Sequence, residues 1–190
     1  TIRLVYFDTD KTKYEYRFAK EKGWIKQTQK CIEKIKIKKY GKIIITYSFT
    51  EEHYDYLNSF LNYLKTIGYN NEIILTSRFL SFKFEEKGKT YLDRILTKKN
   101  MKFDKKRDER KMYEKIRFSD FKINKKLKDL ANLYKIQFID KTQLQCDFDK
   151  ENCHIITDLN EKIYVDESPH LTLEGAKFFS KNISNILILE

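Results

Sequence analysis

The chain has 190 residues, which is enough for one domain with a substantial core and too few for two domains of ordinary size. Its 41% of hydrophobic residues, with 15% aromatic residues, exclude an intrinsically disordered chain. The formal net charge is +11, but only seven of the 39 basic residues are Arg, the residue that binds phosphate and guanine bidentately, so we do not expect a nucleic-acid partner.

The beginning of the chain predicts two strands with a helix between them. Ile2–Phe7 reads IRLVYF, which is typical of a strand, and the apolar residues between Trp24 and Lys38 recur at a spacing compatible with a helix. Lys42–Tyr47 reads KIIITY, a continuous apolar run typical of a strand buried on both faces. This alternation of strands and helices favours an α/β protein.

The next segment predicts a parallel strand pair. Apolar residues recur with helical period from Leu57 to Leu64, and Gly68 is a natural end for that helix. The strand Glu72–Phe79 follows directly. A strand, a helix and a second buried strand form a right-handed βαβ unit, so we expect the two strands to be parallel.

Residues from about 85 to 120 are predicted to form a charged excursion. Both charge signs mix there with few apolar positions, as in KKNMKFDKKRDERKMYEKIRF. Such composition is typical of solvated helical or irregular chain, so we expect the excursion to be exposed.

The second half of the chain completes the α/β pattern. We expect a helix at Ile123–Tyr134, a strand at Lys135–Asp140, a strand pair at His154–Ile156 and Lys162–Val165, and a last helix at Leu173–Ile186. The whole chain, residues 1–190, is therefore predicted to be a single α/β domain. Its fold class is the three-layer flavodoxin-like kind with a central, mainly parallel sheet.

The last helix has a recognisable start. Thr172 is expected to cap it, and Glu174 suits the positive end of its dipole. Ala176, Phe179 and Ile183 recur at a spacing that can face a core.

The three cysteines are Cys31, Cys146 and Cys153. The last two flank a short polar loop, and no CxxC pattern occurs, so we expect no metal site. Two Cys in this position suit either a disulfide in an oxidising compartment or two free thiols in the cytosol.

One histidine lies beside two acids in a loop. His170 directly precedes the last helix, with Asp166 and Glu167 four and three residues upstream. Hydrolase-type chemistry needs an imidazole that takes a proton from a hydroxyl nucleophile, and a carboxylate that orients the imidazole. His53 begins a helix and is interpreted as a surface residue, and His154 directly follows Cys153 in the loop or in the strand after it, so His170 is the candidate base.

The segment around His170 resembles a known family. YVDESPHLTLEGAKFF is similar to the last block of the SGNH family, which commonly reads Y-x-D-x-x-H-L-[ST]-x-x-G-A. Upstream, the strand KIQFID, the Cys pair and the hairpin strand KIYVD resemble the SGNH domains fused to acyltransferase-3 membrane proteins. The resemblance covers most of the chain in layout, and its motifs are specific over about residues 135–180.

The resemblance implies a function. His170 would be the general base and Asp166 the orienting acid, and Cys146 would be disulfide-bonded to Cys153. The domain would be periplasmic or otherwise extracytoplasmic and tethered to a membrane acyltransferase domain that delivers the acyl donor. Its acceptor would be a cell-surface glycan, such as lipopolysaccharide, and its chemistry would require no metal or organic cofactor.

The chain departs from the family pattern at two points. Glu167 occupies the usual position of the acid, three residues before His170, but we prefer Asp166 because it follows Tyr164-Val165. The chain also contains no G-D-S block and no G-x-S-x-G, and its only serines near expected strand ends are Ser48 and Ser77.

We therefore expect the chain to be an N-terminally incomplete fragment whose nucleophile has either been cut off with the first strand or been lost from the domain. In both cases this chain does not transfer acyl groups alone. The alternatives are a carbohydrate acetyl-esterase of the same fold and a non-catalytic glycan-binding domain.

Overall fold

The computed structural model describes residues 2–7, 13–18, 41–46, 48–83, 92–93, 102–166 and 170–188. These residues belong to two compact units, each with its own hydrophobic core. Unit 1 comprises Thr1–Arg78 and Lys122–Asp140, and unit 2 comprises Phe79–Phe121 and Lys141–Glu190. The helix expected at Trp24–Lys38 and the residue Cys31 lie outside the described residues.

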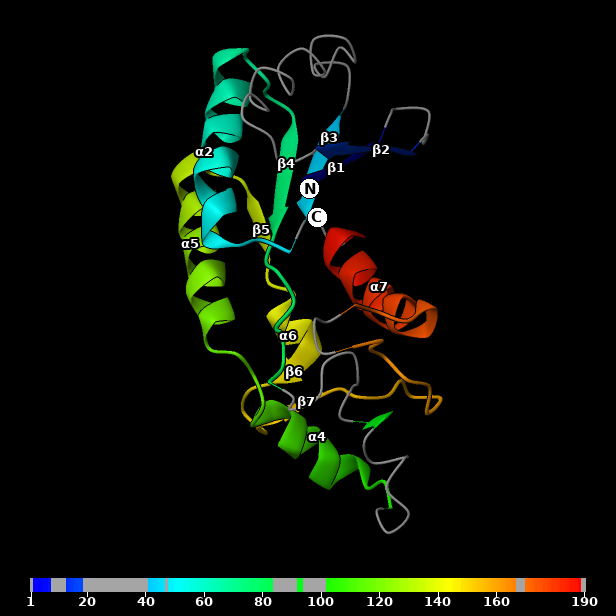
Figure 1. Cartoon of the computed structure of the whole chain (residues 1–190). Helices are drawn as coiled ribbons and strands as arrows, with labels where there is room; N and C mark the ends of the chain where they lie inside the picture. Colours follow the sequence, from blue (N-terminus) through cyan, green and yellow to red (C-terminus); the bar gives the residue numbers. More distant parts are fainter. Residues whose placement is uncertain are drawn as a thin grey trace. The chain divides into compact units, whose positions relative to one another are not determined.

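Unit 1 is a mixed α/β structure built on a five-stranded sheet with the strand order β2-β1-β3-β4-β5 (Figure 1). The three strands β3, β4 and β5 are parallel neighbours, which confirms the parallel pairing predicted from the sequence. The strands are β1 (Ile2–Phe7), β2 (Lys13–Phe18), β3 (Lys42–Thr46), β4 (Glu72–Thr76) and β5 (Gln137–Ile139).

The other two strands add an antiparallel edge that was not predicted. β1 pairs antiparallel with both β2 and β3, and the β1–β2 register joins Ile2 to Phe18 and Phe7 to Lys13. The signal for β2 is present in KYEYRF, because its aromatic residues stand at every second position. The segment is highly charged, and that charge hid the alternation.

Two helices cover one face of this sheet, α2 (Glu51–Thr66) and α5 (Ser119–Tyr134) (Figure 1). Their apolar stripes pack on Ile43 and Ile45 of β3 and on Leu75 of β4. Ile44 is only half-buried, so the expectation that β3 is buried on both faces is wrong in detail. The alternation of buried and half-buried residues is that of a strand with one face on the core.

Defined hydrogen bonds fix both ends of α2. At the end of α2, the Gly68 N–H donates to the Lys65 carbonyl and the Tyr69 N–H donates to the Leu64 carbonyl, both at 3.0 Å. These two bonds define a Schellman motif, and Gly68 adopts its left-handed φ of 70°. The start of α2 is fixed by His53, whose Nδ1 accepts from the Thr50 N–H at 3.1 Å.

Unit 2 is assembled from short elements around an apolar core. The core includes Leu80, Met112, Ile163, Tyr164 and Phe179. Its elements are α4 (Lys105–Tyr113), α6 (Thr142–Gln145), β6 (Cys146–Asp147), β7 (Asn152–Cys153) and α7 (Leu173–Ile188).

The predicted strand pair in this unit is reduced to one antiparallel bridge, Ile156 with Lys162. In α7, Phe179 is buried as expected. Ala176 is exposed, so its predicted place on the core face is wrong.

The charged excursion predicted at residues 85–120 is partly buried where it is described. Met112 is 1% exposed, and the carboxylates of Asp108 and Glu109 are also buried. The Arg107 guanidinium and the Asp104 N–H both donate to Asp108 at 2.8 Å. Burial acts to raise the pKa of Asp108, but these hydrogen bonds and the charge of Arg107 outweigh it and hold the pKa below its ordinary value. The exposed-excursion prediction is therefore wrong for the buried side of α4, where specific partners allow Asp108 to enter the core, and it holds for the exposed residues Lys105–Arg107 and Arg110.

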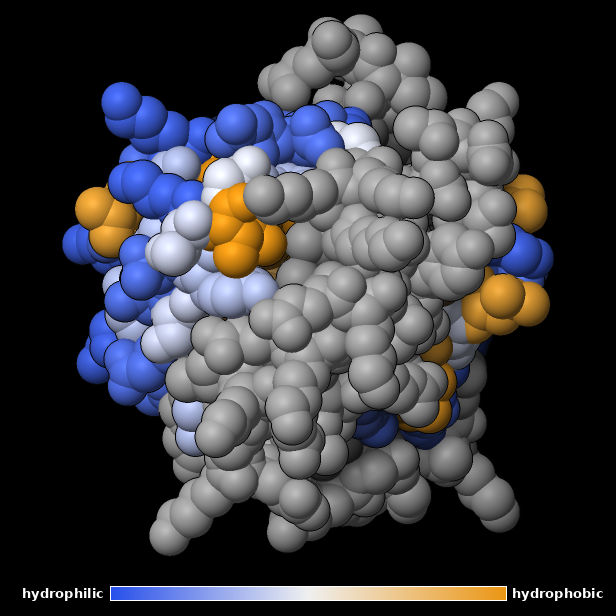
Figure 2. Space-filling view, turned by 90° about the horizontal axis from the view of Figure 1, so that it is seen from above, coloured by the Kyte–Doolittle hydropathy of each residue, from blue (hydrophilic) through white to orange (hydrophobic). Residues whose placement is uncertain are grey.

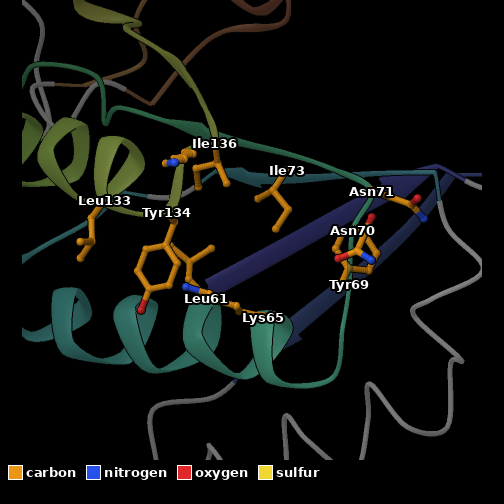
Figure 3. Close-up of a pocket in the computed structure, with 10 residues that line it drawn as sticks. Leu61, Lys65, Tyr69, Asn70, Asn71, Ile73, Leu133, Tyr134 and Ile136 are labelled. Carbon is orange, nitrogen blue, oxygen red and sulfur yellow. The ribbon is translucent and has the colours of Figure 1, made fainter.

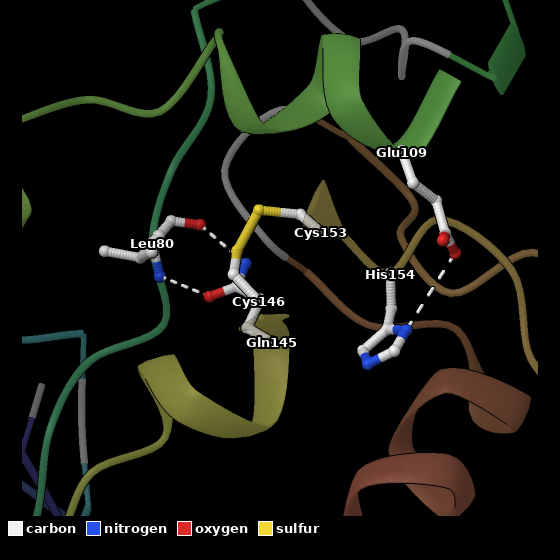
Figure 4. The surroundings of a disulfide bond; sticks show 6 residues. All are labelled: Leu80, Glu109, Gln145, Cys146, Cys153 and His154. Carbon is white, nitrogen blue, oxygen red and sulfur yellow. Dashed lines mark hydrogen bonds and ion pairs between the residues drawn. A yellow bond between two sulfur atoms is a disulfide. The ribbon is translucent and has the colours of Figure 1, made fainter. Parts of the chain in front are cut away.

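A disulfide joins Cys146 to Cys153, as the family resemblance implied (Figure 4). It crosslinks the antiparallel hairpin of β6 and β7, in which these two residues are directly opposite. The preceding residue, Gln145, exchanges two hydrogen bonds with the backbone of Leu80, at 2.7 and 2.9 Å. This hairpin is thereby tied to the segment that begins unit 2.

The described surface is largely hydrophilic in the view of Figure 2, with apolar side chains in small separate patches. Large exposed apolar residues include Phe118, Leu133, Leu159 and Leu173. Among the described residues, no helix is long and apolar enough to span a bilayer.

We expect loss of the disulfide to destabilise unit 2. Replacing both Cys146 and Cys153 with Ala should lower the free energy of unfolding by about 2–3 kcal/mol, because a crosslink over a short loop restricts the unfolded chain. Urea denaturation of the oxidised protein measures the difference, and Cys31→Ala is the matched control.

Thiol titration of the same protein in denaturant should find one reactive thiol before reduction and three afterwards, since the chain has three Cys. Three reactive thiols before reduction would contradict the assigned bond.

Candidate active site

The structure brings the two predicted site residues together. The Nδ1 atom of His170 lies 2.7 Å from Oδ2 of Asp166. The His170 side chain is 72% exposed, whereas the Asp166 side chain is 23% exposed. The alternative acid, Glu167, lies outside the described residues. The imidazole therefore has a carboxylate partner on one side and access to solvent.

Backbone pairing shapes the loop that carries this pair. Tyr164 and Leu171 form an antiparallel bridge, and the Val165 N–H donates to the His170 carbonyl at 2.7 Å. The Tyr164 ring is buried and packs edge-on against Phe82 with ring centroids 5.6 Å apart. The bridge thus joins the two ends of the loop next to the buried Tyr164 ring, and it keeps Asp166 within reach of His170.

Burial raises the pKa of Tyr164, and the nearby Glu109 carboxylate adds to this shift. The Tyr164 hydroxyl therefore stays neutral even in alkaline solution.

The start of α7 fixes the C-terminal end of this loop. The Thr172 hydroxyl accepts from the Gly175 N–H at 3.0 Å, which confirms Thr172 as the N-cap of α7. The Thr172 N–H donates to the Ile163 carbonyl at 2.9 Å. A Cβ atom at Gly175 would overlap the Ile163 carbonyl oxygen and lie 2.9 Å from the Ile163 carbonyl carbon and Cα. Only glycine allows α7 to begin this close to residue 163.

This geometry has a chemical consequence. A carboxylate can only accept hydrogen bonds, so contact with Asp166 favours the tautomer of His170 that carries its proton on Nδ1. Nε2 then has a free lone pair and can accept a proton from a hydroxyl group. When it does, the Asp166 carboxylate stabilises the imidazolium that forms. The pair can therefore act as a base, provided that a nucleophile is supplied.

A second histidine in unit 2 also faces a carboxylate (Figure 4). His154 Nδ1 lies 3.9 Å from Oε1 of Glu109, which is beyond hydrogen-bond distance, and the His154 ring packs edge-on against Phe178. Sequence reasoning missed this contact, because Glu109 is 45 positions away in a run of mixed charge. The longer distance makes His154 a weaker candidate base than His170.

The two serine candidates belong to unit 1. Ser48 is exposed just after β3. Ser77 follows β4, is fully buried and donates its N–H to the Ile139 carbonyl at 2.9 Å. A buried hydroxyl cannot meet an external acyl donor, so Ser77 is not a suitable nucleophile. The described residues contain no cluster of three or more His, Cys, Asp or Glu suited to a metal ion.

Comparison with known proteins finds no similar protein. No protein-family model matches the chain, and neither a curated protein nor a solved structure is detectably similar to it.

We expect Gly175→Ala to destabilise the protein by about 1–3 kcal/mol, because the new methyl group must displace the backbone of Ile163. Helix propensity alone predicts the opposite sign, a gain of about 1 kcal/mol. Urea denaturation followed by circular dichroism measures the change.

Gly41→Ala is the matched control, since a Cβ at Gly41 meets nothing within 4 Å. Equal effects of the two substitutions would contradict the packing role of Gly175.

Proposed function

We propose that this chain is an SGNH-type domain with a flavodoxin-like arrangement, from a bacterial O-acyltransferase that acts on cell-surface glycans. The 2.7 Å contact between Asp166 and His170 is the observation that carries the proposal, since it supplies two of the three groups in a Ser-His-Asp mechanism. The three parallel strands of unit 1 are compatible with such a fold. The disulfide is compatible with an extracytoplasmic location.

The mechanism assigns each proton transfer to His170. Nε2 takes the proton of a serine hydroxyl contributed from outside this chain, and the serine oxygen attacks the carbonyl carbon of the acyl donor. The imidazolium then gives the proton to the leaving group as the acyl-enzyme forms. In the second half, Nε2 takes the proton of a sugar hydroxyl, whose oxygen attacks the acyl-enzyme, and the proton finally returns to the serine.

Asp166 has a different role in this scheme. It keeps its charge throughout and holds the Nδ1–H tautomer, so it orients His170 and stabilises the imidazolium. In this proposal Asp166 takes the role of the family's acid although it stands four residues before the histidine. The contact with His170 favours it over Glu167.

The assignment predicts a graded loss of activity in the polypeptide that includes the nucleophile. His170→Ala should lower kcat/KM for acyl transfer at least ~10³-fold, because it removes the base. Asp166→Asn should lower kcat/KM by roughly 10²- to 10⁴-fold, because it removes the carboxylate that holds His170 in the Nδ1–H tautomer. Glu167→Gln should stay within about twofold of the wild type. Transfer of a labelled acetyl group to an oligosaccharide, followed by mass spectrometry, measures these rates.

His53→Gln is the control, since Gln at this helical position keeps the capping interaction with Thr50. Transfer of the label to water alone would identify an esterase instead. Unchanged transfer by His170→Ala would rule out the mechanism.

The coding sequence upstream of Thr1 is a separate test. A G-D-S block preceded by membrane spans supports the transferase. A start codon immediately before Thr1 would leave a non-catalytic glycan-binding domain.

A further inference from the structure

Unit 1 contains a pocket of about 370 Å³ (Figure 3). The ends of α2 and α5 and the first residues of β4 line it. Its volume falls in the range of small-molecule sites, roughly 300–1,000 Å³. No step of the proposed acyl transfer uses it.

The inner wall of the pocket is apolar. Leu61 from α2, Ile73 from β4 and Ile136 before β5 point toward its centre in Figure 3. The Tyr134 ring stands beside them and is held in place, because its hydroxyl donates to Asn58 Oδ1 at 2.7 Å. A flat, fixed aromatic ring next to aliphatic groups is suited to the C–H face of a sugar ring.

The rim is polar and basic. Asn70 and Asn71 are exposed there, and Lys65 and Lys135 add two ammonium groups. No acidic side chain lines the pocket. The nearest acid at this end of β4, Glu72, is paired with Lys42 at 2.8 Å. A ligand with a carboxylate would therefore meet two positive charges and no unpaired acid among the lining residues.

The tyrosines contribute no charge. Burial and the charge of Glu72 raise the pKa of Tyr69 to about 12, and burial also raises the pKa of Tyr134.

The helix ends distinguish a sugar from a simple anion. The C-terminal end of a helix carries partial negative charge, which disfavours a bare anion. The Schellman bonds engage two carbonyls in each helix. A carbonyl oxygen has two lone pairs, so one that accepts a single bond can accept a second. Sugar hydroxyls can donate to such carbonyls while a carboxylate on the same ring contacts the lysines.

Lys135 occupies a position that favours glycine. The Lys135 N–H donates to Asn132 and the Ile136 N–H donates to Ala131, so α5 ends in the same motif as α2. Where α2 has Gly68, α5 has Lys135 at a φ of 53°. A non-glycine residue in this region is strained, and such strain concentrates at functional sites. Lys135 thus places an ammonium group at the pocket at a cost in stability.

We propose that this pocket binds one acidic sugar residue of a glycan chain, with Lys65 and Lys135 contacting its carboxylate. The proposal depends on the lining alone and not on the acyl transfer proposed above, although a glycan is the substrate class of both.

Direct binding tests it on the full chain. Isothermal titration with a galacturonate trisaccharide, a hyaluronan tetrasaccharide and sialyllactose should find saturable binding of at least one with a Kd below about 5 mM, and no comparable binding of maltotriose. The double variant Lys65→Met/Lys135→Gly should weaken that binding at least about tenfold, because it removes two charge-assisted hydrogen bonds.

Matched variants separate binding from folding. Lys125→Met/Lys128→Met removes the same charge from exposed positions of α5 outside the pocket and should bind as the wild type does. Lys135→Gly alone should bind more weakly yet unfold at a higher temperature, since glycine relieves the strain at this φ. His170→Ala should bind unchanged, so a failure of this proposal and a failure of the acyl-transfer proposal give different results.

Four outcomes would overturn the proposal. The first is that none of the three acidic oligosaccharides binds. The second is that maltotriose binds as well as they do, and the third is that inorganic phosphate competes as strongly as the sugar acid. In the fourth, vesicles of anionic phospholipid bind in a Lys65- and Lys135-dependent manner while the oligosaccharides do not, and the pocket then recognises a membrane surface.

Discussion

The close approach of Gly175 to the backbone of Ile163 is the constraint on which the candidate site depends. With no Cβ at position 175, α7 can begin against residue 163, and the N-cap Thr172 can donate to the Ile163 carbonyl. The chain from Tyr164 to Leu171 must then turn back within a short loop, because both of its ends are fixed by backbone hydrogen bonds. Asp166 and His170 are held within hydrogen-bond distance as a result. The absence of a single Cβ atom at position 175 therefore affects the geometry of Asp166 and His170, which lie nine and five residues upstream.

Two carboxylates of unit 2 differ in burial and in hydrogen-bond partners, and this difference separates a structural carboxylate from a candidate catalytic one. Asp108 is fully buried and saturated by Arg107 and the Asp104 N–H, which is the pattern of a structural carboxylate. Asp166 is partly exposed and contacts an imidazole that is itself open to solvent. Proton exchange with a substrate requires that openness, whereas a stable core requires its absence. Asp108 is thus less suited to catalysis than Asp166.

The sequence predicted the elements whose signals are local. The helical period around Leu57, the stop at Gly68 and the apolar run of β3 correspond directly to α2 and its flanking strands. The contact of Asp166 with His170 was also predictable, because a short loop places an acid and a histidine within reach. By contrast, the strand β2 was hidden by its charges, and the burial of Glu109 beside His154 depends on a contact across 45 positions for which composition gives no signal. Ala176 has helical spacing to Phe179, but spacing does not reveal which positions of the stripe the core actually reaches.

The described contacts that position the acid–histidine pair all come from unit 2 itself. The loop ends are paired within residues 163 to 172, the cap and Gly175 belong to α7, and the Tyr164 ring packs on Phe82. A base organised in this way does not depend on the group that it activates, so its geometry can persist in a chain that lacks a recognisable nucleophile. Preorganisation of this kind is favourable for catalysis, because the imidazole need not be reoriented when the hydroxyl arrives. For the proposed mechanism, the one group still required is a serine hydroxyl within hydrogen-bond reach of Nε2 of His170.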